Sequence, residues 1–211
     1  MNKQDSGINW EEQWKNFSPA FYNGASHIDL SPYDPQCTKE LLLKAGGGFG
    51  DLSHPTTRLC LKLMAPFVKG ATIVDIGCGS GILMLSGLLM GARHAIGIDI
   101  EEDALEHAAA NAKLNHLAKK AVFTKKIERK HLEENLLFLM NMISSEQKMA
   151  WEEQKPLHSQ KAVLVTSGIL TEQRAPYLNW AERQGWKTIT EASEEGWAGF
   201  VFTLQEGYSP S

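Results

Sequence analysis

The chain has 211 residues, of which 43% are hydrophobic and 22% charged, proportions that are ordinary for a globular protein able to bury a core. Its formal net charge of −4 argues against an extended nucleic-acid-binding surface, which would be basic. The polar start of the chain and the lack of a long apolar stretch predict neither a secretory leader nor a membrane span, so we expect a cytoplasmic protein.

The cysteines and the basic residues give weaker signals. Cys37, Cys60 and Cys78 form no C-x-x-C pair, so we expect no metal site, and their low, odd number is typical of a reducing compartment. The basic residues between positions 119 and 130 could form a local patch, although a solvated loop or helix face is the simpler interpretation.

Residues 1–50 show no clear periodicity. We interpret them as an irregular extension that precedes a main domain at 51–211 and packs on it through aromatic side chains. These aromatic residues are Trp10, Trp14, Phe17, Phe21, Tyr22 and Tyr33. The glycine-rich segment 45–51 predicts a flexible turn.

From position 53 onward, strand and helix patterns alternate. A helix begins near 53–55, where Ser53 or His54 can cap it and Pro55 suits its first turn. Strands are predicted at 72–76, 95–98, 121–124, 136–142 and 162–165, and helices at 81–90, 103–114, within 146–154 and at about 172–184. Two last strands, 186–190 and 197–204, flank an acidic turn at 191–196 and are expected to be antiparallel. The pattern predicts an α/β, Rossmann-like doubly wound sheet with ligands at the carboxyl ends of its strands.

A glycine-rich loop follows the first of these strands. It runs from Asp75 through Gly77, Gly79 and Gly81, and glycines there allow a sharp turn and a close approach to a ligand. The third glycine stands one place earlier than in the dinucleotide fingerprint, which would need it at Ile82. The D-x-G-x-G-x-G spacing resembles the first motif of class I S-adenosylmethionine-dependent methyltransferases. A tight turn without a ligand, or a nicotinamide oxidoreductase, are the alternatives, and the absence of G-K-[ST] excludes a P-loop.

Asp99 strengthens this interpretation. It ends the second strand of the main domain, where an acidic side chain can accept hydrogen bonds from both ribose hydroxyls of an adenosine. The alternative is that Asp99 caps the following helix.

Further motifs resemble the PrmA-type ribosomal-protein methyltransferases over most of the chain. They are the segments 48–57, 75–83, 95–100, 141–143 and 167–170, the helix residues Asn111, Ala112 and Asn115, and the linker-like Trp10, Trp14 and Phe17. The resemblance implies a seven-stranded, mostly parallel sheet with a C-terminal antiparallel hairpin and helices on both faces. It implies S-adenosylmethionine as the cofactor and a lysine or N-terminal amine of a ribosomal or other protein as the acceptor.

The residues that we expect to contact the cofactor belong to these family-like motifs. They are Thr57, Asp75, Gly77, Cys78, Gly79, Gly81, Asp99, Ile100 and Asn141. Asn141 is also the lead catalytic candidate, because the resemblance places it beside the reaction centre. Thr57 could instead bond its own helix, Asn141 could be an ordinary turn residue, and His54 is expected to serve the helix start rather than act as a base.

Two departures from the family pattern bear on the acceptor. The chain has no room for the additional N-terminal substrate-recognition domain of PrmA-type enzymes, and Gly50-Asp51-Leu52 replaces their glycine-threonine-glycine. The sequence therefore leaves open a methyltransferase for a small molecule or another acceptor, and a cofactor-binding protein without turnover. The oligomeric state is not indicated.

Overall fold

The computed structural model describes residues 10–18, 20–46, 50, 52–128, 132 and 135–204. Its helices are α1 (Trp10–Phe17), α2 (Pro55–Met64), α3 (Ile82–Leu89), α4 (Glu102–Leu114), α5 (Ser144–Glu153) and α6 (Arg174–Arg183), with short 3-10 turns at Ala65–Phe67, Lys155–Leu157 and Thr171–Gln173. Its strands are β1 (Phe21–Tyr22), β2 (Ala25–Asp29), β3 (Glu40–Lys44), β4 (Thr72–Ile76), β5 (His94–Ile98), β6 (Ala121–Thr124), β7 (Leu136–Asn141), β8 (Ala162–Leu170), β9 (Lys187–Glu194) and β10 (Trp197–Leu204).

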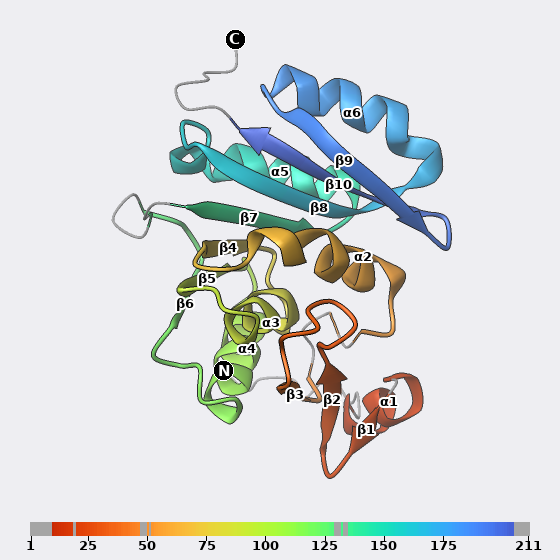
Figure 1. Ribbon diagram of the computed structural model, residues 1–211, viewed down its shortest axis with the longest axis vertical. Coiled ribbons are helices and arrows are strands. Elements are labelled where there is room, and N and C mark those ends of the chain that lie inside the picture. The colour runs from red at the N-terminus through yellow and green to blue at the C-terminus, as the bar shows by residue number, and fades with distance from the viewer. Residues whose placement is uncertain are drawn as a thin grey trace, which may run out of the picture.

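A seven-stranded sheet forms the centre of the molecule, in the order β6-β5-β4-β7-β8-β10-β9 (Figure 1). The pairs from β6 to β8 are parallel, whereas β10 pairs antiparallel with both β8 and β9. The predicted mostly parallel sheet with a terminal antiparallel hairpin is therefore confirmed. The chain leaves β4 toward β5 on one side and later returns to β7 on the other, which makes the carboxyl end of β4 the switch point where such sheets bind ligands.

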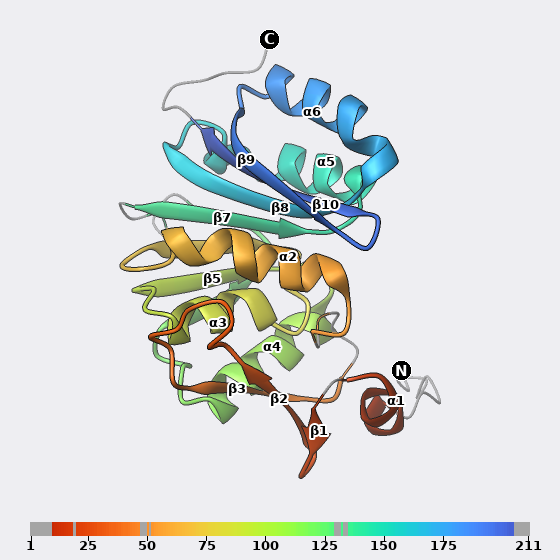
Figure 2. The same cartoon turned by 45° about the vertical axis from the view of Figure 1, so that its right-hand side comes forward.

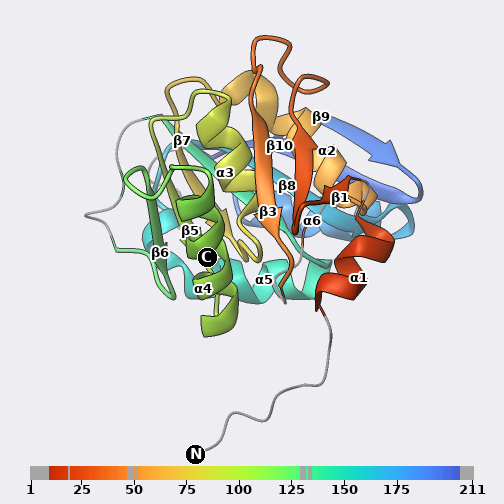
Figure 3. The same ribbon diagram turned by 90° about the horizontal axis from the view of Figure 1, so that it is seen from below.

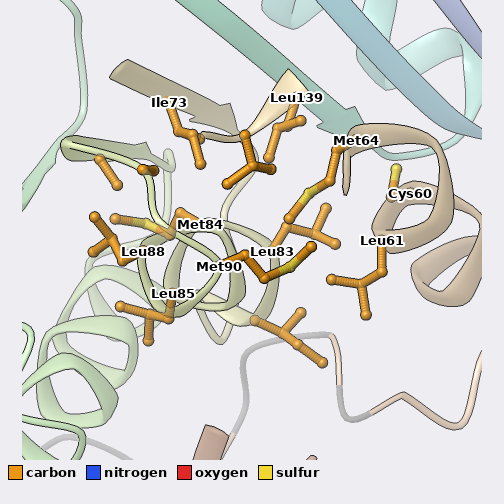
Figure 4. Close-up of a cluster of buried hydrophobic side chains, with 14 of the residues drawn as sticks. Cys60, Leu61, Met64, Ile73, Leu83, Met84, Leu85, Leu88, Met90 and Leu139 are labelled. Carbon is orange, nitrogen blue, oxygen red and sulfur yellow. The ribbon is translucent and has the colours of Figure 1, made fainter. Parts of the chain in front are cut away.

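Helices cover both faces of this sheet (Figure 2). Helices α2, α3 and α4 pack on one face, where Figure 4 shows Ile73 and Leu139 of the sheet above Met84 of α3 and Met64 of α2. On the other face, Trp151 of α5 and Tyr177 of α6 belong to a second buried cluster. Burial of these side chains stabilises the sheet by about 1.5–3 kcal/mol each.

The prediction that residues 1–50 are irregular is wrong for the segments 10–17, 21–22, 25–29 and 40–44. They contain α1 and an antiparallel three-stranded sheet, β1-β2-β3, and β3 contacts α3 and α4 (Figure 3). A hairpin signal was present in Asn23-Gly24, whose φ angles are both positive, at 53° and 77°, as a type I′ turn requires. The expected glycine turn falls mainly at 47–49 and 51, outside the described residues.

The aromatic side chains of this N-terminal part behave differently from one another. Trp14 is buried and donates its indole N–H to the Gly46 carbonyl at 3.1 Å, and Phe21 and Tyr33 pack partly buried against the same core. Tyr22 is 49% exposed and stacks on His27 instead, so its predicted packing on the main domain is wrong. The side chains of Trp10 and Phe17 lie outside the described ones.

The ends of other elements also differ from prediction. Strand β9 extends to Glu194, so the turn predicted at 191–196 is only Glu195-Gly196, both with positive φ. Strand β8 continues five residues past Val165, to Leu170, because it pairs with β10 on its far side.

Candidate functional site

A cavity of about 1000 Å³ opens at the carboxyl ends of β4, β5 and β7. Its volume is at the upper end of the range of small-molecule sites. Residues Ile76, Gly77, Gly79, Ile98, Asp99 and Ile100 line it on the side of β4 and β5. Asn141, Met142, Ile143, Gly168 and Trp197 line the side of β7 and β10, and α5 contributes Glu146, Met149 and Glu153.

The glycine loop turns back onto the end of β5. The N–H groups of Gly77 and Cys78 both donate to the Ile98 carbonyl, at 2.7 and 3.0 Å. Gly77 has a φ of +74°, and a Cβ there would overlap the sulfur of Met142. The positive φ favours glycine at this position, and an added Cβ would also push the flexible Met142 side chain aside.

Asp99 lies at the end of β5, half-buried in the cavity wall. Its Oδ2 accepts from the Gly79 N–H at 3.0 Å and its Oδ1 from the Glu101 N–H at 3.1 Å. Helix α4 has Glu101 as its N-cap residue, so Asp99 does not occupy the cap position. Each carboxylate oxygen has a second lone pair, which leaves this side chain able to accept from a ligand in the cavity.

Asn141 ends β7 and lies against the first turn of α2. Its Nδ2 donates to Thr57 Oγ1 at 3.4 Å. Thr57 is fully buried and does not line the cavity, so its hydroxyl meets the Asn141 amide from behind the wall. The pair joins a strand end and a helix that are 84 positions apart in the sequence.

The predicted site residues thus fall into two groups. Gly77, Gly79, Asp99, Ile100 and Asn141 line one cavity. Thr57, Asp75, Cys78 and Gly81 are not among the residues that line it. As direct cofactor contacts, all nine residues remain predictions.

Asp75 is a buried carboxyl group of β4. It is 1% exposed, and its Oδ2 accepts from the Met84 N–H of α3 at 3.3 Å. No described group bonds its Oδ1. Burial raises the pKa of Asp75 to about 7, with a further contribution from the charge of Asp99. Asp75 therefore supports the start of α3 beneath the glycine loop.

His54 serves the start of α2, as expected. Its Nδ1 lies 2.8 Å from Thr56 Oγ1 and accepts from the Thr56 N–H, and Pro55 follows in the first turn. The imidazole packs edge-on against Trp197, with the ring centres 5.1 Å apart. Together His54 and Trp197 form an aromatic side of the cavity that the sequence did not indicate.

Gln147 was also missed, although it holds the loop that follows Asn141. This buried side chain donates from Nε2 to the carbonyls of Met142 and Ser167, both at 2.7 Å, and its Oε1 accepts from the Tyr177 hydroxyl. Gly168 has a φ of +92°, and a Cβ there would overlap the Met142 backbone. A glutamine on a helix carries no sequence signal for such a role.

Comparison with known proteins places the chain in a family. A family model described as ribosomal protein L11 methyltransferase (PrmA) matches residues 3–205. A ribosomal protein L11 methyltransferase of Legionella pneumophila is 35% identical over 204 residues, which are 92% of this chain and 68% of the relative. The chain belongs to the PrmA family. Another PrmA relative, from Saccharophagus degradans, is 46% identical over 117 residues, covering 53% of this chain and 40% of its own length.

Solved methyltransferase structures share the fold of this chain. A ribosomal protein L11 methylase from Lactobacillus delbrueckii subsp. bulgaricus matches with a TM-score of 0.65 at 21% identity, over 85% of this chain and 99% of its own. A putative methyltransferase from Escherichia coli matches with a TM-score of 0.56 at 16% identity, over 81% and 95% of the two chains.

PrmA membership confirms the predicted resemblance and the predicted enzyme class, an S-adenosylmethionine-dependent methyltransferase. Among the described residues of this PrmA chain, no helix is long and apolar enough to span a membrane. The same residues contain no group of three or more His, Cys, Asp and Glu side chains that could hold a metal ion.

Proposed function

We propose that this chain transfers the methyl group of S-adenosylmethionine to an amine of a protein. Its relatives are named ribosomal protein L11 methyltransferases, which supports a protein as the methyl acceptor. The observation that carries the proposal is that Asp99, the glycine loop and Asn141 line one continuous cavity. One end of this cavity suits an adenosine, and the other leaves room for an acceptor.

The residues on the Asp99 side fit the cofactor. Gly77 and Gly79 present backbone without side chains, which permits close approach of a ligand. The Asp99 carboxylate, fixed by two backbone N–H groups, suits the two hydroxyls of a ribose. Ile100 is 71% exposed beside it, and this apolar side chain can cover a flat base.

The charge of the lining also suits this cofactor. Asp99, Glu101, Asp103, Glu146 and Glu153 line the cavity, whereas no Lys or Arg occurs in the lining made by the described residues. A carboxylate-rich wall favours a cationic sulfonium and an amine-bearing acceptor over an anionic ligand such as a dinucleotide phosphate.

The chemistry requires little from the protein beyond positioning. When bound, S-adenosylmethionine would supply an electrophilic sulfonium methyl group, which passes to the acceptor nitrogen as the C–S bond breaks and S-adenosylhomocysteine is released. The amide oxygen of the Asn141 side chain can accept a hydrogen bond from an N–H of the amine that is to be methylated. Its amide nitrogen bonds Thr57, which fixes the orientation of the group. We infer that Thr57 acts through Asn141.

The acceptor amine has to be neutral when it reacts, and a lysine has a reference pKa of about 10.4. His54 Nδ1 already accepts from the Thr56 N–H, so this nitrogen is committed to the helix start. Apolar side chains such as Met142 and Trp197 favour the neutral amine, whereas the carboxylates of the same lining attract the protonated one. We infer that the proton leaves to solvent through the open mouth of the cavity.

Thermal unfolding with added ligands tests cofactor binding. S-adenosylmethionine or S-adenosylhomocysteine at a hundred times its dissociation constant should stabilise the chain by about 2.7 kcal/mol, and NAD should not. Asp99→Ala should remove most of this response. Glu172→Ala, which deletes an exposed carboxylate of the turn before α6, should keep it. A response to NAD alone, or an unchanged response of Asp99→Ala, would contradict the proposal.

The acceptor is tested with a radiolabelled methyl donor. Label should enter ribosomal protein L11 or another protein fraction of a lysate. Label confined to small molecules would instead support a small-molecule methyltransferase. Binding without any labelling would support a cofactor-binding protein that lacks turnover.

The Thr57–Asn141 pair gives a test of positioning. Thr57→Val keeps the shape but removes the hydroxyl, so kcat should fall about three- to tenfold, which corresponds to the net strength of one hydrogen bond. The dissociation constant of the cofactor should change little, and Thr57→Ser should restore most of kcat. Loss of cofactor binding in Thr57→Val would instead show that the Thr57–Asn141 pair serves to hold the cofactor.

A further inference from the structure

Strand β3 is an edge strand of the small N-terminal sheet, and side chains of α4 bond its outer edge. On its inner side β3 pairs with β2. On its outer side the N–H groups of Leu42 and Lys44 donate to Asn115 Oδ1 and Asn111 Oδ1, both at 2.9 Å. Asn115 Nδ2 returns a bond to the Leu42 carbonyl at 2.7 Å. Two amides one helical turn apart therefore take the place of a further strand.

Asn111 reaches further than Asn115. While its oxygen accepts from Lys44, its Nδ2 donates to the Ser80 carbonyl at 2.9 Å. Ser80 stands between Gly79 and Gly81 in the glycine loop. Asn111 and Ser80 are both fully buried, so water cannot replace this bond. One side chain thus joins β3 to the loop that lines the cofactor side of the cavity.

Ser80 makes a second hydrogen bond to the N-terminal part of the chain. The Ser80 hydroxyl donates to the Gly50 carbonyl at 2.7 Å and accepts from the Ile82 N–H at 3.3 Å. A Cβ on Gly50 would approach the Ile82 side chain to 2.6 Å. The backbone at Gly50 is therefore packed directly against the end of the glycine loop. Ser80 is held on its carbonyl and on its hydroxyl by partners linked to the first 50 residues.

The position of Ser80 bears directly on the site. Its neighbour Gly79 donates its N–H to Asp99, and Gly81 is the N-cap residue of α3. A shift of Ser80 therefore moves the loop backbone relative to the Asp99 carboxylate. Left without Asn111, the buried Ser80 carbonyl would lack this donor, and the loop would rearrange to reach another.

We propose that Asn111 is a positioning residue for the glycine loop, and that through Asn111 the docking of β3 sets the affinity of the cavity for S-adenosylmethionine. The inference rests on the proposed function of this cavity. It makes the N-terminal sheet a part of the cofactor site, although none of its residues lines the cavity. Coupling of this kind is reciprocal, so cofactor binding also tightens the seam between β3 and α4.

The helix provides a matched control for this proposal. Asn111→Ala and Asn115→Ala both remove bonds to β3, but only Asn111→Ala frees Ser80. Both variants should be less stable to urea. Calorimetric titration with S-adenosylhomocysteine, on samples shown to be folded by circular dichroism, should give a dissociation constant about three- to tenfold higher for Asn111→Ala. Asn115→Ala loosens β3 but leaves Ser80 bonded, so it should give a smaller increase.

Hydrogen exchange of the wild-type chain tests the coupling without a variant. Saturation with S-adenosylhomocysteine should slow exchange of the Lys44 amide, which bonds Asn111, more than that of the Leu42 amide, which bonds Asn115. Equal affinities of the two variants, or no slowing at Lys44, would overturn this inference alone. A wild-type chain that binds neither S-adenosylmethionine nor S-adenosylhomocysteine would overturn the proposed function as well.

Discussion

The Tyr177 hydroxyl of α6 donates to Gln147 Oε1 of α5 at 2.6 Å, inside the layer of helices behind β7 and β8. Burial raises the pKa of Tyr177, so the hydroxyl keeps its proton and remains a donor. Because Gln147 in turn holds the carbonyls of Met142 and Ser167, the contact supports the loop that follows Asn141.

Tyr177→Phe should therefore lower the free energy of unfolding by about 1–3 kcal/mol, since it leaves the buried Gln147 oxygen without its donor. Urea denaturation measures the change. Tyr22→Phe is the matched control, because its ring is 49% exposed, and it should stay within about 0.5 kcal/mol of wild type. Equal stabilities of the two variants would show that the Tyr177 bond contributes nothing.

Gly77→Ala should reduce cofactor affinity at least about tenfold and destabilise the chain. The added Cβ would overlap the Met142 sulfur at a φ of +74°, and the left-handed conformation alone costs about 1–2 kcal/mol. Thermal unfolding and ligand titration measure the two effects.

Gly70→Ala separates the backbone cost from the loss of cofactor affinity. Gly70 has a φ of +72° but no atom within 4 Å of an added Cβ. This variant should show the backbone cost with unchanged cofactor affinity. If Gly77→Ala also kept its affinity, the glycine loop would not form the cofactor site.

Asp75 should make the chain less stable as the pH rises from about 4 to about 7. An aspartate in water has an ordinary pKa of 3.8, whereas burial raises the pKa of Asp75 in the folded chain to about 7. The folded state therefore binds more protons in this window, and its stability falls as they are lost. Above pH 7 the contribution is constant.

Asp75→Asn isolates this effect from that of the other carboxyl groups. The free energy of unfolding of the variant, relative to wild type, should increase across this pH window, by up to about 4 kcal/mol for a shift of this size. Urea denaturation at several pH values gives the comparison. Parallel pH profiles would show that Asp75 is not protonated in the folded chain.

Arg58 should influence the aromatic side of the cavity. Its guanidinium bonds Glu194 at 2.6 Å, Glu195 at 2.8 Å and the Ser53 carbonyl at 2.8 Å, and so it ties the residues next to Trp197 and His54. Arg58→Ala should lower stability by only about 1 kcal/mol, because such partly exposed pairs contribute little. It should raise the KM for the acceptor in steady-state assays.

Arg174→Ala is its control on the same hairpin. Arg174 pairs with Glu191 of β9 at 2.9 Å, and both side chains are largely exposed. A comparable small loss of stability with an unchanged KM is expected. The same rise in KM for both variants would mean that the hairpin as a whole, not the Arg58 contact, positions the site.

The main domain could be predicted from sequence because its signals are local. Strand β4 is a continuous buried run between Gly70 and the glycine loop, and its predicted bounds of 72–76 are those found. Strand β9 shows the limit. Its residues are mostly exposed and charged or small, so only the pairing with β10, which the sequence does not display, makes Glu191–Glu194 a strand.

The difference between local signals and long-range contacts also explains which site residues could be predicted. Gly77, Asp99 and Asn141 stand at strand ends, and the topology brings strand ends together. Asn111, Gln147 and Trp197 reach the site through long-range contacts that follow no spacing rule. Thr57 was predicted as a cofactor contact, but only the three-dimensional packing shows its hydroxyl against Asn141.

All three cysteines are free thiols and buried. Burial raises the pKa of Cys60 and of Cys78, so neither forms a thiolate readily, and the thiolate is the form that reacts with alkylating agents. Modification has to wait until the chain opens. The rate at which an alkylating agent modifies each buried cysteine therefore reports how often that part of the folded protein opens. Because Cys78 belongs to the glycine loop, its modification rate would report the opening of that loop.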